Sequence, residues 1–164
     1  MEAMRINKFL SKCGYCSRRE ADRLLELGKI RVNGHIPVLG QMISGQDEVT
    51  VDGVKVHLEE KEILIAYHKP KGIVCTCRDE EDSIVKQIDL KERIYPVGRL
   101  DKDSTGLILL TNNGELMNQI LRGKNMHEKE YKVVVNKPVS PEVVKAMEQG
   151  VPILGQMTRP CKIS

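Results

Sequence analysis

Hydrophobic and polar positions follow both helical and strand-like periods along the chain, which predicts short helices and short strands in mixed order. In the first part, a capping sequence beginning at Ser17 precedes a helical apolar pattern, and Gly28 is placed to end that helix. An Asn-Gly pair at 33–34 lies between β-prone runs at 29–32 and 35–38, which predicts a hairpin. We therefore expect two short helices packed on a small sheet.

A further strand is expected over 47–56, around a turn at 52–53. The pattern of the second part predicts four strands and two helices. The strands fall at 63–67, 73–77, 106–110 and 129–136, and the helices at 115–122 and 141–150. Alternation in 129–136 places Tyr131, Val133 and Val135 on one face. This mixed order indicates an α+β fold.

The chain of 164 residues has room for one ordinary domain or two small ones. A charged stretch without apolar periodicity suggests a boundary, so we predict a domain at 1–58, a linker at 59–62 and a second domain at 63–164. The longest apolar run, 106–110, is too short to cross a membrane, and the start shows no secretory signal. We expect a cytoplasmic protein without a membrane partner, and five cysteines fit a reducing compartment.

Charge is distributed unevenly along the chain. Residues 1–35 contain eight Lys or Arg against four acids, so they carry +4 while the rest of the chain carries −1. Such asymmetry predicts a small basic module that binds a polyanion, although a solvated helix face is an alternative. Only 3% of residues are aromatic, which argues against a single-strand binder that stacks several bases.

Other candidate chemistry is weakly supported. Cys13 and Cys16 have the spacing of half a zinc site or a redox pair, but Cys75 and Cys77 do not complete a metal-ligand pattern. Core packing is the simpler interpretation of this pair, and no metal is expected. The four histidines, at 35, 57, 68 and 127, do not cluster. Motifs for a serine nucleophile, a P-loop or a dinucleotide site do not occur.

The richest segment is 96–114, where Arg99 and Asp101 lie in a loop of small and polar residues before the most hydrophobic strand. Catalytic groups are often found on loops held by rigid strands. On local physics alone, a polar turn in which Asp101 caps the backbone or pairs with Arg99 is an equal alternative.

Three parts of this segment, 98–101 (Gly-Arg-Leu-Asp), 105–107 (Thr-Gly-Leu) and 110–114 (Leu-Thr-Asn-Asn-Gly), closely resemble the catalytic motif of the RsuA-like family of ribosomal RNA pseudouridine synthases. Residues 67–72 and 127–131 resemble two further motifs of that family. Residues 4 to about 54 are similar to the S4 RNA-binding domain that precedes its catalytic domain. The resemblance covers the chain from Met4 to Ser164.

The resemblance implies isomerisation of a specific uridine in ribosomal RNA, expected in 23S RNA, to pseudouridine without a cofactor. Asp101 would be the essential carboxylate, acting as a nucleophile on the base or ribose or as a proton acceptor. Tyr131 would lie against the uracil, and Arg99 would enter the stack where the target nucleotide leaves. The expected partner is structured ribosomal RNA, bound by a monomer.

RNA contacts are expected mainly from the basic module. The full set predicted to bind RNA is Arg5, Lys8, Arg18, Arg19, Arg23, Lys29, Arg31, Lys69 and Lys71. The last two would line the site or meet phosphates. Family members continue beyond a segment like 150–155 with strands that carry a basic partner for the catalytic carboxylate, so we expect the catalytic domain to be incomplete at its C-terminus. A non-catalytic RNA-binding or ribosome-assembly factor is the alternative function.

Overall fold

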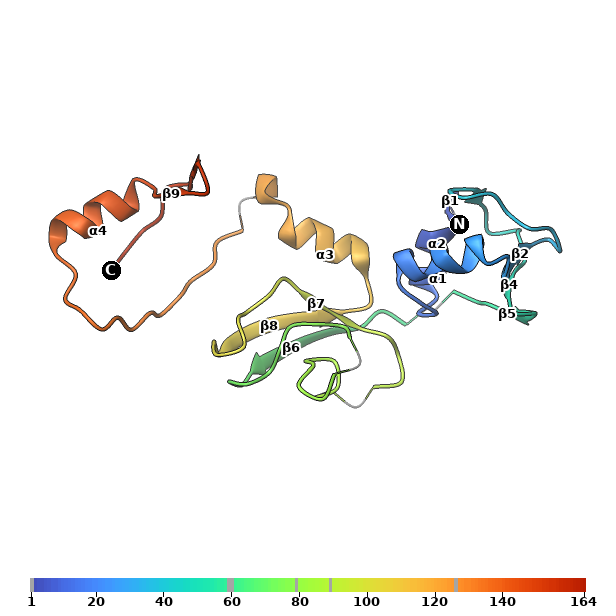
Figure 1. Cartoon of the computed structure of the whole chain (residues 1–164), viewed down its shortest axis with the longest axis horizontal. Coiled ribbons are helices and arrows are strands. Elements are labelled where there is room, and N and C mark those ends of the chain that lie inside the picture. Colours follow the sequence, from blue (N-terminus) through green and yellow to red (C-terminus); the bar gives the residue numbers. More distant parts are fainter. Residues whose placement is uncertain (1, 59–60, 79, 89, 126) are drawn as a thin grey trace. The chain divides into compact units, whose positions relative to one another are not determined.

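The computed structural model describes residues 2–58, 61–78, 80–88, 90–125 and 127–164. It divides into two compact units, Met1–His127 and Glu128–Ser164, which we describe separately. Figure 1 shows the elements of each unit, coloured along the sequence.

The first part of the larger unit is a small helical layer on short strands. Its helices are α1 (Ile6–Lys12) and α2 (Arg18–Glu26). Its strands are β1 (Met4–Arg5), β2 (Ile30–Val32), β3 (Met42–Ile43), β4 (Val49–Val51) and β5 (Val54–Lys55). They form a β1–β3 pair and a β2-β4-β5 sheet, all antiparallel. The two helices bury their apolar faces against these strands in one core, as predicted.

Local sequence explains the ends of α2. The Ser17 hydroxyl accepts a hydrogen bond from the Glu20 amide at 3.1 Å, and this satisfies one of the unpaired donors at the helix start. Gly28 follows the helix at φ +65°, a left-handed conformation that glycine adopts without strain. Both features agree with the sequence prediction.

The predicted hairpin at 33–34 is only partly formed. Asn33 and Gly34 both have positive φ, as a tight hairpin turn requires, and Val32 pairs with His35 in a single bridge. No strand follows over 35–38, so that prediction is wrong. Pro37 has no N–H group to continue a ladder, and β2 pairs instead with β4.

The second part of this unit is a three-stranded antiparallel sheet. It contains β6 (Leu64–Lys69), β7 (Tyr95–Val97) and β8 (Gly106–Thr111), in the order β6-β8-β7. The apolar strand β8 is central, and Ile108 and Leu110 are buried on it in a second core. Helix α3 (Gly114–Leu121) and a 3-10 turn (Gly123–Asn125) follow.

Two expectations for this sheet need correction. Residues 73–77 do not form a strand, and only Val74 makes a single parallel bridge, to Ser83. The second neighbour of β8 is β7, which the pattern did not predict because the strand has three residues and contains Pro96. Both sides of β8 are therefore already paired, so residues 73–77 cannot lie beside this central strand.

The smaller unit contains α4 (Pro141–Glu148) and a hairpin of β9 (Pro152–Ile153) and β10 (Gln156–Met157). This helix falls within the predicted range 141–150, and Ser140 caps it with proline in its first turn. Residues 129–136 form no strand, and Val133 is exposed. A strand needs a neighbour to satisfy its backbone groups, and none of the described strands pairs with this segment.

The predicted domain boundary at 59–62 remains a prediction. Residues 59 and 60 lie outside the described residues, and the two compact units divide at residues 127 and 128 instead. Within the described part of the chain, no helix is long and apolar enough to cross a membrane.

Candidate functional site

Asp101 lies on the loop between β7 and β8. Glycines at 98 and 106 flank this loop at φ +90° and +143°, and the Ser104 amide donates to the Asp101 carbonyl oxygen at 3.0 Å. The Asp101 side chain is exposed, and none of the described residues gives its carboxylate a hydrogen bond or an ion pair. The alternative of a structural pair between Asp101 and Arg99 is therefore not what the structure contains.

Lys69, at the end of β6, holds the residue after Asp101. Its side chain is fully buried, and Nζ donates to the carbonyl oxygens of Pro70 and Ile73, both at 2.9 Å, and of Lys102, at 3.2 Å. Three acceptors compensate the cost of burying an ammonium group. The Gly72 amide donates to the same Lys102 carbonyl at 2.8 Å. This loop is thus tied to the turn after β6.

The expectation that Lys69 contacts RNA needs correction. A buried ammonium group that already donates to three carbonyls has no surface for a phosphate. Its neighbour Lys71 is exposed and stays a candidate for RNA contact. Alternation along β6 turns Lys69 inward at the end of the strand, whereas Lys71 lies beyond the strand, in the turn.

The residue before Asp101 is held as well. The Leu100 amide lies 3.3 Å from the Cys75 sulfur, which is buried in the second core. On the other side, the Lys102 ammonium pairs with Asp82 at 2.6 Å, which lowers the pKa of that carboxyl and raises the pKa of Lys102. Both neighbours of Asp101 are therefore anchored, while its own carboxylate remains open to a ligand.

The other predicted site residues differ in placement. Arg99 is exposed and lines a cleft in the larger unit. Tyr131 belongs to the smaller unit, where it is 66% exposed. The roles of Arg99 and Tyr131 in a reaction stay predictions.

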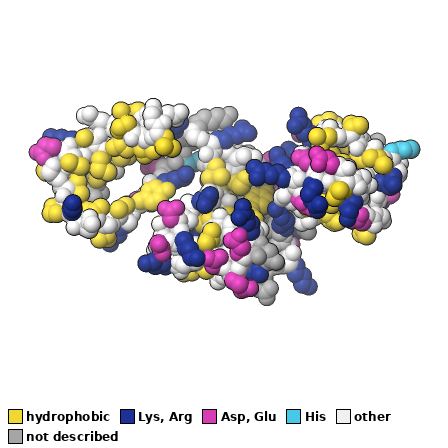
Figure 2. All heavy atoms as spheres, viewed as in Figure 1, with side chains coloured by type: hydrophobic (Ala, Val, Ile, Leu, Met, Phe, Trp, Pro, Cys, Tyr) yellow, Lys and Arg dark blue, Asp and Glu magenta, His cyan; other side chains and the backbone are white. Residues whose placement is uncertain are grey.

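The basic residues of the first part are on the outside of the molecule, as Figure 2 shows for the face it presents. Some are already paired there. Arg23 binds Glu20 through two hydrogen bonds, and Lys29 lies 3.3 Å from Asp52. Among the described residues, no ion pair involves the remaining exposed arginines of this group, which are Arg5, Arg18, Arg19 and Arg31. These four can meet phosphates without first breaking an ion pair.

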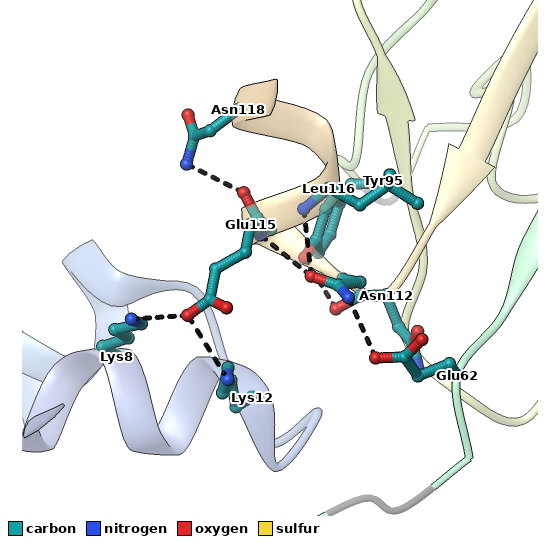
Figure 3. A network of polar contacts seen from close by, with 10 residues as sticks. Lys8, Lys12, Glu62, Tyr95, Asn112, Glu115, Leu116 and Asn118 are labelled. Carbon is teal, nitrogen blue, oxygen red and sulfur yellow. Dashed lines mark hydrogen bonds and ion pairs between the residues drawn. The ribbon is translucent and has the colours of Figure 1, made fainter. Parts of the chain in front are cut away.

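A cleft of about 530 Å³ lies between α1 and the β7–α3 part of the larger unit. Its lining includes five basic side chains and one carboxylate: Lys8, Lys12, Arg18, Arg93, Arg99 and Glu115. Glu115 accepts from Lys8 at 2.7 Å and lies 3.4 Å from Lys12, as Figure 3 shows. The hydrogen bond from Lys8 and the charge of Lys12 lower the pKa of Glu115.

Glu115 is fixed by the start of α3. The Asn113 side chain caps this helix, accepting from the amides of Glu115 at 2.9 Å and Leu116 at 3.1 Å. Arg93, which lies just before β7 and also lines the cleft, donates to the Cys16 carbonyl at 3.3 Å. Sequence reasoning did not single out Lys12, Arg93 or Glu115. An acid in the first turn of α3 was visible, but its lysine partners are distant in sequence.

Cys13 and Cys16 pack against the first core, in agreement with the simpler interpretation. Burial raises the pKa of Cys13 to about 12 and also raises the pKa of Cys16. Thiols with raised pKa values are poor nucleophiles and poor metal ligands at neutral pH. Among the described residues, no group of three or more His, Cys, Asp or Glu could hold a metal ion.

Comparison with known proteins gives two family matches. A family described as RNA pseudouridylate synthase matches residues 63–152, and the S4 domain matches residues 4–37. A solved structure titled "Crystal structure of pseudouridylate synthase" aligns with a TM-score of 0.62 and 28% identity, covering 96% of this chain and 70% of that one. The antiparallel sheet and the N-terminal module thus have known counterparts.

Curated relatives extend the similarity over nearly the whole chain. The dual-specificity RNA pseudouridine synthase RluF of Escherichia coli strain K12 is 49% identical over 98% of this chain and 57% of its own length. Ribosomal large subunit pseudouridine synthase B of Bacillus subtilis strain 168 is 35% identical over 96% of this chain and 66% of its own length. The chain thus spans a little over half of RluF.

Proposed function

We propose that this chain, which belongs to the RNA pseudouridylate synthase family, converts a specific uridine of ribosomal RNA to pseudouridine with Asp101 as the essential carboxylate. The observation that carries the proposal is the Asp101 loop. Both neighbours of Asp101 are anchored, by Lys69 and Cys75, while its carboxylate is exposed and has no partner among the described residues. Such a group is positioned for chemistry on a bound nucleotide.

The reaction rearranges bonds without a co-reactant. The bond between uracil N1 and ribose C1′ breaks, the base turns, and a bond forms between uracil C5 and the same C1′. The hydrogen of C5 leaves as a proton, and N1 gains a proton, so atoms and electrons balance. Asp101 contributes either by attacking the ribose or the base, or by accepting a proton, and the exposed position of its carboxylate allows each role.

The target nucleotide must leave its stack before it reaches Asp101. Arg99 lies two residues before Asp101 and is exposed, so its guanidinium is available to fill the space that the nucleotide vacates. Tyr131 would lie against the uracil. The arginines of the N-terminal module that make no ion pair with a described residue, Arg18 and Arg19 among them, would hold the RNA through its phosphates.

The test is tritium release from a ribosomal RNA transcript labelled at uracil C5, because the new carbon bond must expel that hydrogen. We expect release by the parent chain and by Asp103→Asn, and none by Asp101→Asn. Asp103 is a matched control, being an exposed acid on the same loop. Equal release by both variants would contradict the role of Asp101. RNA binding without release by the parent chain would favour the alternative, a non-catalytic RNA-binding factor.

A further inference from the structure

The cleft between α1 and the β7–α3 part has more positive charge than a single small anion needs. Five basic side chains line it against the one carboxylate of Glu115, which gives the lining an excess of four positive charges. Each phosphodiester carries one negative charge, so this lining matches several successive phosphates. The cleft of about 530 Å³ includes exposed arginines, Arg18 and Arg99, in its lining.

Glu115 occupies the position of an anion in this cleft. Its carboxylate accepts from Lys8 and lies near Lys12, two lysines one turn apart on the same face of α1 (Figure 3). Solvent reaches both ends of this contact, because the side chains of Lys8 and Lys12 are 33% and 36% exposed and that of Glu115 is 53% exposed. A phosphate oxygen makes the same charge-assisted hydrogen bonds with ammonium groups as a carboxylate does.

We propose that this cleft binds the sugar–phosphate backbone of RNA, and that a phosphate replaces Glu115 as the partner of Lys8 and Lys12. The inference rests on the proposed function and deepens it, because it adds residues from both parts of the larger unit to the RNA-binding surface. Lys12 and Arg93 join the RNA-contacting set, and Glu115 acts as a competitor that the RNA must displace. Arg99 lines the same cleft, so RNA held there passes the loop that carries Asp101.

The most direct test removes the charge of Glu115, which competes with the RNA phosphate for Lys8 and Lys12. In filter binding with an unmodified 23S ribosomal RNA transcript at low salt, we expect Glu115→Gln to bind about two- to fivefold more tightly than the parent chain, the range set by exposed ion pairs. Glu48→Gln is the matched control. Glu48 is 54% exposed and pairs with Lys55 at 2.7 Å, the same distance as Lys8 to Glu115. We expect no change in affinity for this control.

The lysines are tested through the salt dependence of binding. Replacing Lys8 and Lys12 together by Gln should reduce the slope of log K against log salt by about 0.7 to 0.9, which is the contribution of the one phosphate that the two lysines would share. Lys55→Gln should leave the slope unchanged. Bound RNA should also protect Lys8 and Lys12 of the parent chain, but not Lys55, from acetylation by acetic anhydride, which requires no variant to fold.

Equal affinities of Glu115→Gln and Glu48→Gln, or unprotected Lys8 and Lys12 in the RNA complex, would overturn this inference. Tritium release by the parent chain would then still support the proposed function, so the two failures are distinguishable. If the parent chain does not bind the RNA at all, both proposals are wrong. Tighter binding of Glu115→Gln combined with protected lysines would support the cleft as an RNA site, whatever the rate of release.

Discussion

Replacing Lys69 by Met would test whether the Asp101 loop is held by its buried ammonium group. In the structure, Nζ is the donor for the carbonyls of Pro70, Ile73 and Lys102. Methionine is similar in length and apolar, so the substitution fills the space but supplies no donor. The Lys102 carbonyl keeps its hydrogen bond from the Gly72 amide. The carbonyls of Pro70 and Ile73 lose Nζ as their donor.

The expected loss of unfolding free energy follows from these two carbonyls, those of Pro70 and Ile73. A buried acceptor without a donor costs about 1–3 kcal/mol, so the two together cost about 2–6 kcal/mol. Part of this is offset because the substitution also removes a charge that was expensive to bury. We therefore expect Lys69→Met to lower the free energy of unfolding of the larger unit by about 3 kcal/mol. Lys71→Met, an exposed control next to the same turn, should change it by less than about 0.5 kcal/mol.

Urea unfolding followed by circular dichroism measures the overall loss, and amide hydrogen exchange locates it. Faster exchange is expected at the Gly72 amide, which donates to the Lys102 carbonyl at 2.8 Å. Lys69→Arg retains a charged donor and serves as a second variant if the methionine variant does not fold. The reasoning would be refuted if Lys69→Met and Lys71→Met unfolded at the same urea concentration with unchanged exchange at Gly72.

Three further predictions concern smaller contacts. Ser17→Ala removes the cap of α2 and should cost about 1 kcal/mol in urea unfolding, whereas an unchanged midpoint would show that the cap is dispensable. Because burial raises the pKa of Cys13 to about 12, iodoacetamide should label it at pH 8 much more slowly than the exposed Cys161, as peptide mass spectrometry would reveal. The Ser44 amide, 2.7 Å from the Asp47 carboxylate, lowers the pKa of that carboxyl, so this contact stabilises the fold at neutral pH. Its contribution should disappear as the pH falls through the lowered pKa, and Asp47→Asn should flatten the acid side of the stability curve.

The sequence alone predicts those elements whose ends and buried faces are set by residues close by in the chain. The Ser17 cap, the positive φ of Gly28 and the buried strand β8 all follow from patterns a few residues long. Asp101 was found through a motif, and the structure adds that its neighbours are anchored. Its chemical role is a prediction that the tritium-release assay tests.

Predictions failed where the decisive partner is distant in sequence. Lys69 resembles a surface lysine in a Lys-Pro-Lys turn, and only the fold shows that the Lys102 carbonyl, 33 positions later, receives its ammonium group. Glu115 similarly meets Lys8 across more than a hundred residues. The strand expected at 129–136 needs a neighbouring strand, and alternation alone does not supply one.

The composition of β7 has a consequence for how the protein behaves at high concentration. An open strand edge invites pairing with another chain, which is a common start of aggregation. β7 is at one edge of its sheet, but it has only three residues and its middle residue is Pro96. Proline supplies no N–H group and breaks the row of donors that an added strand would need. This edge is therefore a poor template for self-association, and a Pro96→Thr variant would restore the missing donor.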